Sequence, residues 1–306
     1  MKLAQLKAFL AVVEFGSYSE AALELNMSQA AVSYAVAELE RELGAKILER
    51  GRFGARPNDL GETLAEQARA MMRLETTILE TALASQGRIE GILRVTAFRS
   101  AAGRIVSTLM AKLRKPYPKL TIRLNEVDNN AVHKMQLVQQ RQADIAFIDS
   151  ADPYADDLLT WELVRDPFYA LLPTSDPRDT VDWHDVGSEN LILSTGPTCG
   201  GHVLRHLKSL GRSVTPAHAV QEDSTVTRMV AAELGFGFLP SFAIDALPEG
   251  VKKVPTDTLL ERTIYITLLP ENLKRPSVRV FLNALKDAYP ESELPRLELA
   301  KPLANI

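Results

Sequence analysis

Residues 17–44, SYSEAALELNMSQAAVSYAVAELERELG, contain two consecutive helix signals separated by a short connection. Ser17 and Glu20 have the spacing of a capping box, in which a hydroxyl and a carboxylate satisfy free backbone N–H groups at a helix start. Ser28 is the N-cap expected for a longer helix, whose inward face would carry Val32, Val36, Leu39 and Leu43. Gly44 ends this helix, because glycine readily adopts the left-handed conformation of a helix C-terminus.

The flanking segments complete a small domain. Leu3, Leu6, Phe9, Leu10 and Val13 recur at helical spacing and predict a packing helix over residues 3–15. The region from Gly51 to Gly54 predicts the turn of a two-stranded wing. Two short helices joined by a few residues, after a packing helix, form the helix-turn-helix arrangement. Because any three-helix bundle shows the same spacing, the identities of the residues have to decide whether this domain binds DNA.

These identities resemble those of the LysR-type transcriptional regulators of bacteria. The matching motifs are Tyr18-Ser19-Glu20-Ala21-Ala22, Met27-Ser28-Gln29-Ala30-Ala31-Val32-Ser33, Glu38-Leu39-Glu40, Glu42-Leu43-Gly44, Ile47-Leu48-Glu49-Arg50 and Leu60-Gly61-Glu62. Ala30 stands where the family usually has Pro, Ile47-Leu48 replaces Leu-Phe, and Tyr34 occupies a position that is often basic. These departures concern the individual base contacts rather than the resemblance as a whole.

The resemblance implies a winged helix-turn-helix that binds double-stranded DNA. Candidate residues for the major groove are the short side chains at the start of the third helix, namely Ser28, Gln29, Ala30, Ser33 and Tyr34. Candidates for phosphate contacts are the wing residues Arg50, Arg52 and Arg56. The alternative for each residue is an ordinary solvated surface position.

Charge and composition limit the function further. The chain of 306 residues has a formal net charge of −4, so DNA binding has to depend on local clusters of Lys and Arg rather than on bulk charge. The N-terminus lacks the pattern of a secretory signal, and no apolar run reaches the roughly 18 residues of a membrane helix. We therefore expect a cytoplasmic protein with no membrane partner.

Residues 60–88 predict one long helix. Leu60, Leu64, Ala68, Met71, Ile78 and Ala82 recur in steps of three and four along a narrow apolar seam. A helix lying on its own domain is one explanation. A narrow seam between two globular regions more often pairs with a second chain, as the linker helix of the LysR-type family does. We expect a homodimer, or a homotetramer built from such dimers.

The remainder alternates strand and helix signals, which predicts an α/β domain. Further motifs that resemble the family's effector-binding domain are Gly91-x-Leu93-Arg94-Val95, Tyr117-Pro118, Ala143-Asp144-Ile145-Ala146, Gly235-x-Gly237-x-Leu239-Pro240 and Phe281-Leu282-x-x-Leu285. The resemblance implies an α+β protein with a DNA-binding domain over 1–59, a linker helix over 60–88 and a two-lobed α/β effector domain of periplasmic-binding-protein type over 91–290. Lobe I would comprise 91–163 and 267–290, and lobe II 164–266.

In such a domain the effector lies between the lobes. Candidate effector residues follow strands or open helices, and they are Arg99, Ser100, Asn129, Thr195 and Thr198. Backbone N–H groups at these positions favour a small anionic metabolite. Helix capping is the alternative role for each residue, and Asp149 or Asp152 is an alternative partner that would neutralise Arg99.

Cys199 is the only cysteine, and either a redox sensor or a small buried side chain is consistent with its position. His202 and His206 are one helical turn apart, but no third metal ligand accompanies them in the sequence. The chain lacks nucleotide-binding and nucleophile-elbow motifs, so we expect no enzyme activity, no cofactor and no metal. An enzyme or an exported solute-binding protein is the competing class, but neither accounts for residues 1–60.

Overall fold

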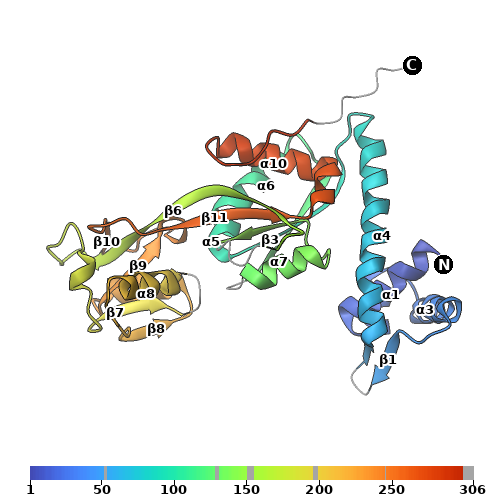
Figure 1. Cartoon of the computed structure of the whole chain (residues 1–306), viewed down its shortest axis with the longest axis horizontal. Coiled ribbons are helices and arrows are strands. Elements are labelled where there is room, and N and C mark those ends of the chain that lie inside the picture. Colours follow the sequence, from blue (N-terminus) through green and yellow to red (C-terminus); the bar gives the residue numbers. More distant parts are fainter. Residues whose placement is uncertain (52–53, 128–130, 150–154, 196–198, 245, 299–306) are drawn as a thin grey trace. The chain divides into compact units, whose positions relative to one another are not determined.

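The computed structural model describes residues 1–51, 54–127, 131–149, 155–195, 199–244 and 246–298. The chain forms two compact units, the first built on Met1–Arg88 and the second on Ile89–Gln139 and Ala143–Ala300 (Figure 1). Helices and strands are mixed in both, as the sequence predicts. None of the helices among these residues is long and apolar enough to cross a membrane.

The first unit has the order helix, helix, helix, wing, long helix. Its elements are α1 (Leu3–Phe15), α2 (Tyr18–Glu24), α3 (Gln29–Leu43), β1 (Leu48–Gly51), β2 (Gly54–Pro57) and α4 (Asp59–Ala84). The N-cap roles predicted for Ser17 and Ser28 are confirmed: Ser17 accepts hydrogen bonds from the backbone N–H groups of Ser19 and Glu20, and Ser28 accepts one from Ala31. Gly16 and Gly44 end α1 and α3 with φ of 65° and 67°, in the left-handed region.

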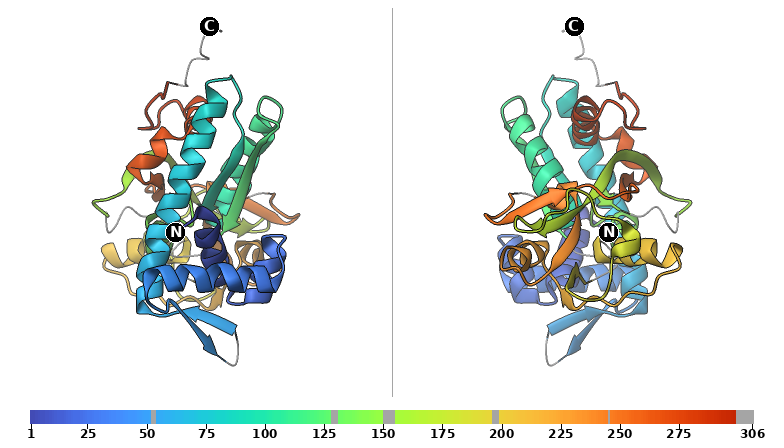
Figure 2. Two further views of the ribbon diagram at one scale, coloured as in Figure 1. Left: turned by 90° about the vertical axis from the view of Figure 1, so that its right-hand side faces the viewer. Right: turned by 90° about the vertical axis from the view of Figure 1, so that its left-hand side faces the viewer.

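One apolar core fixes the three helices and the wing. It contains Phe9, Ala21, Val32, Leu39 and Ile47, all nearly inaccessible to solvent. The antiparallel strands β1 and β2 extend from the helices as a hairpin (Figure 2). Strand β2 is held close to the end of α1, because the Ala55 N–H donates to the Gly16 carbonyl at 2.8 Å.

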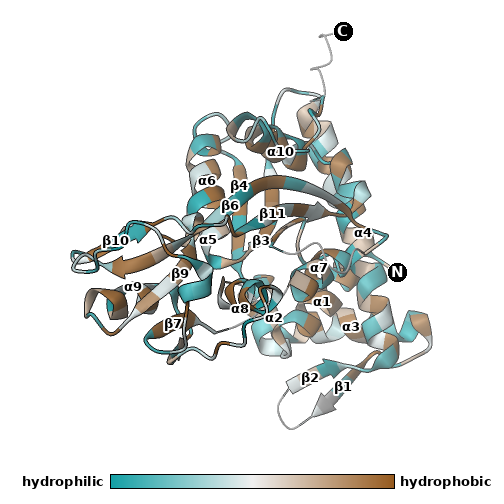
Figure 3. Ribbon diagram, turned by 60° about the vertical axis from the view of Figure 1, so that its left-hand side comes forward, coloured by the Kyte–Doolittle hydropathy of each residue, from teal (hydrophilic) through white to brown (hydrophobic). Residues whose placement is uncertain are grey.

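Helix α4 has two apolar faces, one buried in the first unit and one exposed to solvent. Some residues of the predicted seam lie on the first face and others on the second. Ala65 and Ala68 are buried in the core of the first unit, with Leu64 packed against it. By contrast, Leu74 and Ile78 are 63% and 68% exposed, and hydrophobic and hydrophilic residues alternate along the helix (Figure 3). Including Ala68 in a seam between chains was therefore wrong, because its side chain is buried within its own unit.

The second unit is an α/β domain. Its strands are β3 (Gly91–Ala97), β4 (Leu120–Glu126), β5 (Ile145–Ile148), β6 (Leu159–Pro173), β7 (Leu191–Ser194), β8 (His218–Val220), β9 (Phe236–Pro240), β10 (Val251–Val254) and β11 (Glu261–Leu268). Its main helices are α5 (Arg99–Ala101), the π-helical η1 (Ala102–Val106), α6 (Ser107–Arg114), α7 (Ala131–Gln139), α8 (Cys199–Ser209), α9 (Asp223–Ala231) and α10 (Pro276–Ala288). Short 3-10 turns are η2 (Trp183–Asp185), η3 (Ser241–Ala243) and η4 (Pro270–Lys274). The strands β8 and β10 were not predicted, since neither carries the continuous buried apolar run that marks β5 and β7.

The strands of this unit are connected through β6. The order is β4-β3-β5-β11-β6-β9-β7-β8, with β10 also paired to β6. The first half of β6 pairs antiparallel with β11, and its second half pairs with β9 and β10. A single 15-residue strand therefore runs from one part of the domain into the other.

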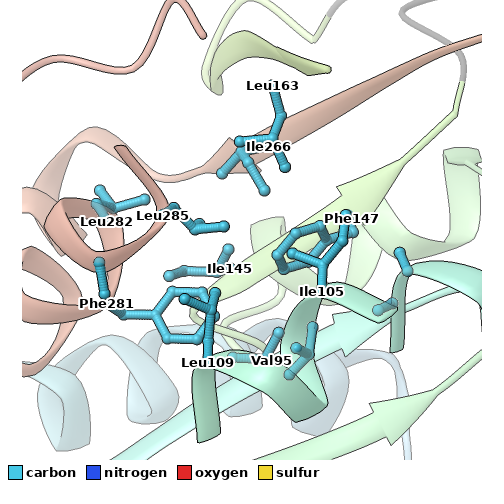
Figure 4. Close-up of a cluster of buried hydrophobic side chains, with 14 of the residues drawn as sticks. Val95, Ile105, Leu109, Ile145, Phe147, Leu163, Ile266, Phe281, Leu282 and Leu285 are labelled. Atoms are coloured by element: carbon cyan, nitrogen blue, oxygen red, sulfur yellow. The ribbon is translucent and has the colours of Figure 1, made fainter. Parts of the chain in front are cut away.

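Two main hydrophobic cores flank this strand. The first lies among β3, β5, β11, α6 and α10 and includes Val95, Phe147, Ile266 and Phe281 (Figure 4). The second lies among β7, β9, α8 and α9 and includes Trp183, Leu193, Val203 and Phe238. We call the elements around the first core lobe I and those around the second core lobe II.

Candidate functional sites

The first candidate site is the N-terminal surface of α3. Gln29 and Ala30 are exposed at the start of the helix, and Tyr34, one turn later, is 69% exposed. Ser33 is half-buried between them. The predicted base-contact residues therefore share one helix start, whose opposite face is anchored by the buried Val32 and Val36.

Ser28 has a structural task at this site. Its Oγ accepts the Ala31 N–H at 3.1 Å, which satisfies one of the free donors of α3. The hydroxyl proton is still able to donate to an acceptor outside the protein. Ser28 thus positions the helix start, whereas the Gln29 amide has both a donor and an acceptor to present.

The wing lies in the same unit. Arg56 is exposed on β2, and its partner in the strand register is Glu49 on β1. Arg50 belongs to β1, whereas Arg52 lies outside the described residues. Glu40 connects the wing to α3, because its buried carboxylate accepts the backbone N–H groups of Ile47 and Leu48 and pairs with Lys46 at 2.6 Å.

The second candidate site is a group of polar side chains around Arg262, which we call the junction cluster. Its members are Ser100, Asp149, Asp166, Cys199, Asp223 and Arg262. Arg262 and Asp166 are register partners on β11 and β6, one rung from the point where β6 leaves β11 to pair with β9. Both residues are buried, and the cluster lies where the two lobes meet.

The guanidinium of Arg262 contacts both lobes. Nε and Nη2 donate to Asp166 Oδ2 at 2.9 and 2.8 Å, and Nη2 also donates to Ser100 Oγ at 2.7 Å. Nη1 lies 3.8 Å from Cys199 Sγ, and the group stacks on the Phe98 ring at 4.9 Å. Burial acts to raise the pKa of Asp166, and Arg262 opposes this by stabilising the carboxylate.

The predicted effector residues have different surroundings. Ser100 is buried and bonded to Arg262, while Thr195 is exposed and donates its hydroxyl to the Val220 carbonyl at 3.0 Å. Arg99 pairs with Glu126 at 3.5 Å and with Glu222. Asn129, Asp152 and Thr198 lie outside the described residues.

Both parts of the chain match sequence profiles of one family. Residues 3–62 match the bacterial regulatory helix-turn-helix protein, lysR family, and residues 86–290 match the LysR substrate binding domain. The chain belongs to the LysR family of transcriptional regulators. The family resemblance and the fold predicted from the sequence are thereby confirmed.

Individual relatives support the same assignment along nearly the whole chain. A probable HTH-type transcriptional regulator, LrrA of Synechococcus elongatus, is 36% identical over 293 residues, covering 95% of this chain and 98% of the relative. The nitrogen assimilation regulatory protein nac of Escherichia coli is 28% identical over 250 residues, covering 81% of each chain. These LysR-family proteins are regulators rather than enzymes, as predicted.

Solved structures share the fold. Full-length OxyR from Pseudomonas aeruginosa superimposes with a TM-score of 0.73 at 24% identity, covering 94% of this chain and 95% of that one. CbnR in complex with its target DNA gives a TM-score of 0.57 at 20% identity, covering 94% and 100%. The family models give this LysR regulator an N-terminal helix-turn-helix domain followed along the chain by a substrate-binding domain.

Cys199 of this regulator is a buried thiol. It is 4% exposed at the start of α8, beside Arg262. Burial raises the pKa of the thiol to about 12, and although Arg262 acts in the opposite direction, nearby carboxylates add to the effect of burial. Because the thiolate is the reactive form, this environment fits the structural alternative better than a redox sensor.

His202 and His206 each pack against an aromatic ring. Burial lowers the pKa of His202 to about 4, and its ring lies 5.9 Å from that of Phe168. His206 packs edge-on against Trp183 at 4.7 Å. Among the described residues, no group of three or more His, Cys, Asp and Glu side chains could hold a metal ion.

The sequence reasoning missed Arg262 and Asp166. They are 162 and 66 positions from Ser100 in the chain, so no local motif links them. One signal was available, because Arg262 is a charged residue near the start of the strand ERTIYITL, directly before a run of apolar and Thr residues. A charge in a central strand requires a buried partner.

Proposed function

We propose that this LysR-type regulator reads a specific operator through the start of α3 and changes its DNA binding when a small metabolite binds between the lobes. The observation that supports it most is the exposure of Gln29, Ala30 and Tyr34 at one helix start, in the same unit as the exposed Arg56 of the wing. The chain would act in the cytoplasm, where its operator is. Residues 1–59 would bind DNA, 60–88 would pair chains, and 91–290 would bind the effector.

For base reading, we assign the central role to Gln29. Its amide can form two hydrogen bonds with an adenine edge in the major groove. Ser33 and Tyr34 would add polar contacts one turn later, and Ala30 would contact a thymine methyl group. Ser28, Arg50, Arg52 and Arg56 would position the domain on phosphates, since such contacts fix register rather than sequence.

For assembly, the exposed face of α4 would pair two chains into a dimer, and two dimers into a tetramer. Met71, Leu74 and Ile78 follow one another at steps of three and four and are 40%, 63% and 68% exposed. The substitution Ile78→Glu should shift the mass measured by light scattering toward the monomer, because a charge would be buried in the interface. Leu23→Glu is a matched control, since Leu23 is 72% exposed on α2.

For the effector, we propose a small metabolite with an anionic group. Ser100 would donate its hydroxyl hydrogen bond from lobe I, and Thr195 would donate from lobe II after giving up its bond to the Val220 carbonyl. Arg99, Asn129 and Thr198 would complete the site. Arg99 would have to exchange its pairs with Glu126 and Glu222 for the ligand. Contacts to both lobes are needed, because only a ligand with different affinities for the two arrangements can shift their populations.

Mobility shift with an operator selected from random-sequence DNA tests the central assignment. Gln29→Ala should weaken binding to the selected operator by about 1–3 kcal/mol and change binding to random DNA little. Arg56→Ala should weaken both and lower the salt slope by about one unit. Gln67→Ala, an exposed glutamine on α4, is the control. Equal loss by Gln29→Ala on both DNAs would falsify base reading.

A further inference from the structure

Arg99 forms ion pairs with acids of both lobes. It is the first residue of α5 in lobe I. Its Nε lies 3.5 Å from Oε1 of Glu126, the last residue of β4, which is the register partner of Ala97 at the end of β3. Its Nη1 donates to Oε2 of Glu222, which lies between β8 and α9 in lobe II. One guanidinium therefore joins a carboxylate of lobe I to a carboxylate of lobe II.

Glu222 has a second set of partners close to it. It is the N-cap residue of α9, but its side chain accepts no hydrogen bond from the described residues at the start of that helix. An N-cap side chain ordinarily accepts a backbone N–H two or three positions later, and a carboxylate at this end also interacts favourably with the helix dipole. The Glu222 carboxylate can therefore bind either Arg99 in the other lobe or the start of its own helix.

The exposure of the Arg99–Glu222 pair makes it easy to break. The two side chains are 36% and 50% exposed, so water can solvate both charges when they separate, and such pairs contribute little to stability. Arg262 also contacts both lobes, but it is 1% exposed, and loss of its contacts would leave a buried charge without a partner. Of these two connections, the Arg99–Glu222 pair is therefore the one that can exchange partners at low cost.

We propose that the Arg99–Glu222 pair is a latch, which holds the lobes of the ligand-free domain in the arrangement of this structure. The inference rests on the proposed function, in which Arg99 belongs to the effector site. Thr195 binds the Val220 carbonyl, two residues before Glu222, so the latch is close in the chain to candidate effector residues of both lobes. An anion that binds Arg99 has to replace the Glu222 carboxylate, which is then free to cap α9. Ligand binding thus removes a contact that only one arrangement of the lobes allows, and the populations shift.

The test measures the distance between the lobes in the full-length protein without ligand. Spin labels are attached to Gln136→Cys on α7 and Ser209→Cys on α8, both exposed positions, in a Cys199→Ala background. Labelled chains are mixed with an excess of unlabelled chains, so that distances within one chain are observed. Glu222→Gln should lower the ratio of latched to unlatched chains about two- to fivefold, which is the effect of losing an exposed ion pair.

Glu126→Gln is the matched control. It removes a carboxylate from the same guanidinium, but one that belongs to lobe I, so the lobes should stay latched. Exchange of the two charges, in Arg99→Glu with Glu222→Arg, should restore the ratio of the parent protein. The latch is overturned if Glu222→Gln leaves the distances unchanged, if Glu126→Gln changes them equally, or if the exchange of charges restores nothing.

Operator affinity separates the latch from the proposed function. Glu222→Gln should change the affinity for the selected operator about two- to fivefold, because it releases the lobes as the effector would. A change in the distances without a change in operator affinity supports the latch and contradicts the proposed link between lobe arrangement and DNA binding. Unchanged distances overturn the latch alone, because base reading and effector binding do not depend on it.

Discussion

The start of α3 and the junction cluster hold their polar side chains in opposite ways. At α3, Gln29, Ala30 and Tyr34 are neighbours in sequence and exposed to solvent, and their backbone is set by the cap at Ser28. In the junction cluster, Arg262 and Asp166 are fully buried and are brought together by strand pairing. Local hydrogen bonds fix the first arrangement, whereas the second depends on the whole domain being folded.

This difference should separate the two regions energetically. Removing one side chain from the exposed surface leaves no buried polar group without a partner. The substitution should therefore change DNA affinity rather than the free energy of unfolding. Removing one partner from a buried pair leaves a buried charge without its counter-ion, which should lower the free energy of unfolding. Substitutions of similar size in the two regions therefore test this difference, because one should change binding and the other stability.

The largest effect should come from Arg262→Met. It leaves Asp166 buried without its partner and should lower the free energy of unfolding by about 3–5 kcal/mol. Both tryptophans, Trp161 and Trp183, lie in the second unit, so tryptophan fluorescence in a denaturant titration reports on this domain. The double substitution Arg262→Met with Asp166→Asn should recover a large part of the loss.

Arg165→Ala is the control for this measurement. Arg165 precedes Asp166 on β6, but its side chain is 63% exposed and forms surface pairs with Glu162 and Glu261. Its removal should change stability by less than about 1 kcal/mol. If Arg262→Met were no more costly than Arg165→Ala, the contrast between a buried and an exposed arrangement would be lost.

A smaller effect is expected for Glu40→Gln in the first unit. Burial opposes ionisation of Glu40, but the hydrogen bonds from Lys46, Ile47 and Leu48 outweigh it and lower the pKa of the carboxyl. The substitution should cost about 1–3 kcal/mol and speed hydrogen exchange of the Ile47 and Leu48 amides. Glu38→Gln, which removes an exposed pair with Arg41, should leave this exchange unchanged.

The same carboxylate gives a pH dependence with a definite sign. Because the folded pKa of Glu40 lies below the unfolded one, its contribution is fully present above the unfolded value and is lost as the pH falls through the folded value. Protection of the Ile47 and Leu48 amides should therefore weaken on acidification in the parent protein. In Glu40→Gln this pH dependence should be much smaller.

These two regions also show why the sequence predicted some features and missed others. Ser17, Ser28, Gly16 and Gly44 act on backbone groups within a few positions, so their roles follow from spacing alone. The pairing of Arg262 with Asp166 joins residues 96 positions apart, and it requires the register of β6 and β11. The prediction for Ala68 on α4 was wrong for a related reason, because periodicity does not show whether a residue packs against its own unit or against a second chain.

A modest effect is expected at the start of α3, where Ser28→Ala and Gln29→Ala should differ in kind. Loss of the Ser28 cap should cost about 1 kcal/mol of stability, seen as a lower Tm in circular dichroism. Gln29→Ala removes no described contact within the chain and should leave Tm unchanged while weakening operator binding. A Tm loss for Gln29→Ala as large as for Ser28→Ala would mean that Gln29 supports the fold rather than reads DNA.

The smallest effect should be at Cys199, which tests whether the junction cluster is as closed as its burial indicates. A pKa near 12 makes the thiolate fraction about a thousandfold smaller than for an ordinary thiol of pKa 9. The folded protein should therefore react slowly with a maleimide at neutral pH, whereas the protein in guanidinium should react at once. Hydrogen peroxide should leave operator affinity unchanged.

A Cys199→Ala, Ser209→Cys variant supplies the comparison, because Ser209 is exposed at the end of α8 and its replacement should label rapidly. Rapid labelling of Cys199 itself would show that the junction cluster opens readily to solvent. Its charged side chains would then be accessible to solvent, as those at the start of α3 are, and the contrast between the two regions would be lost.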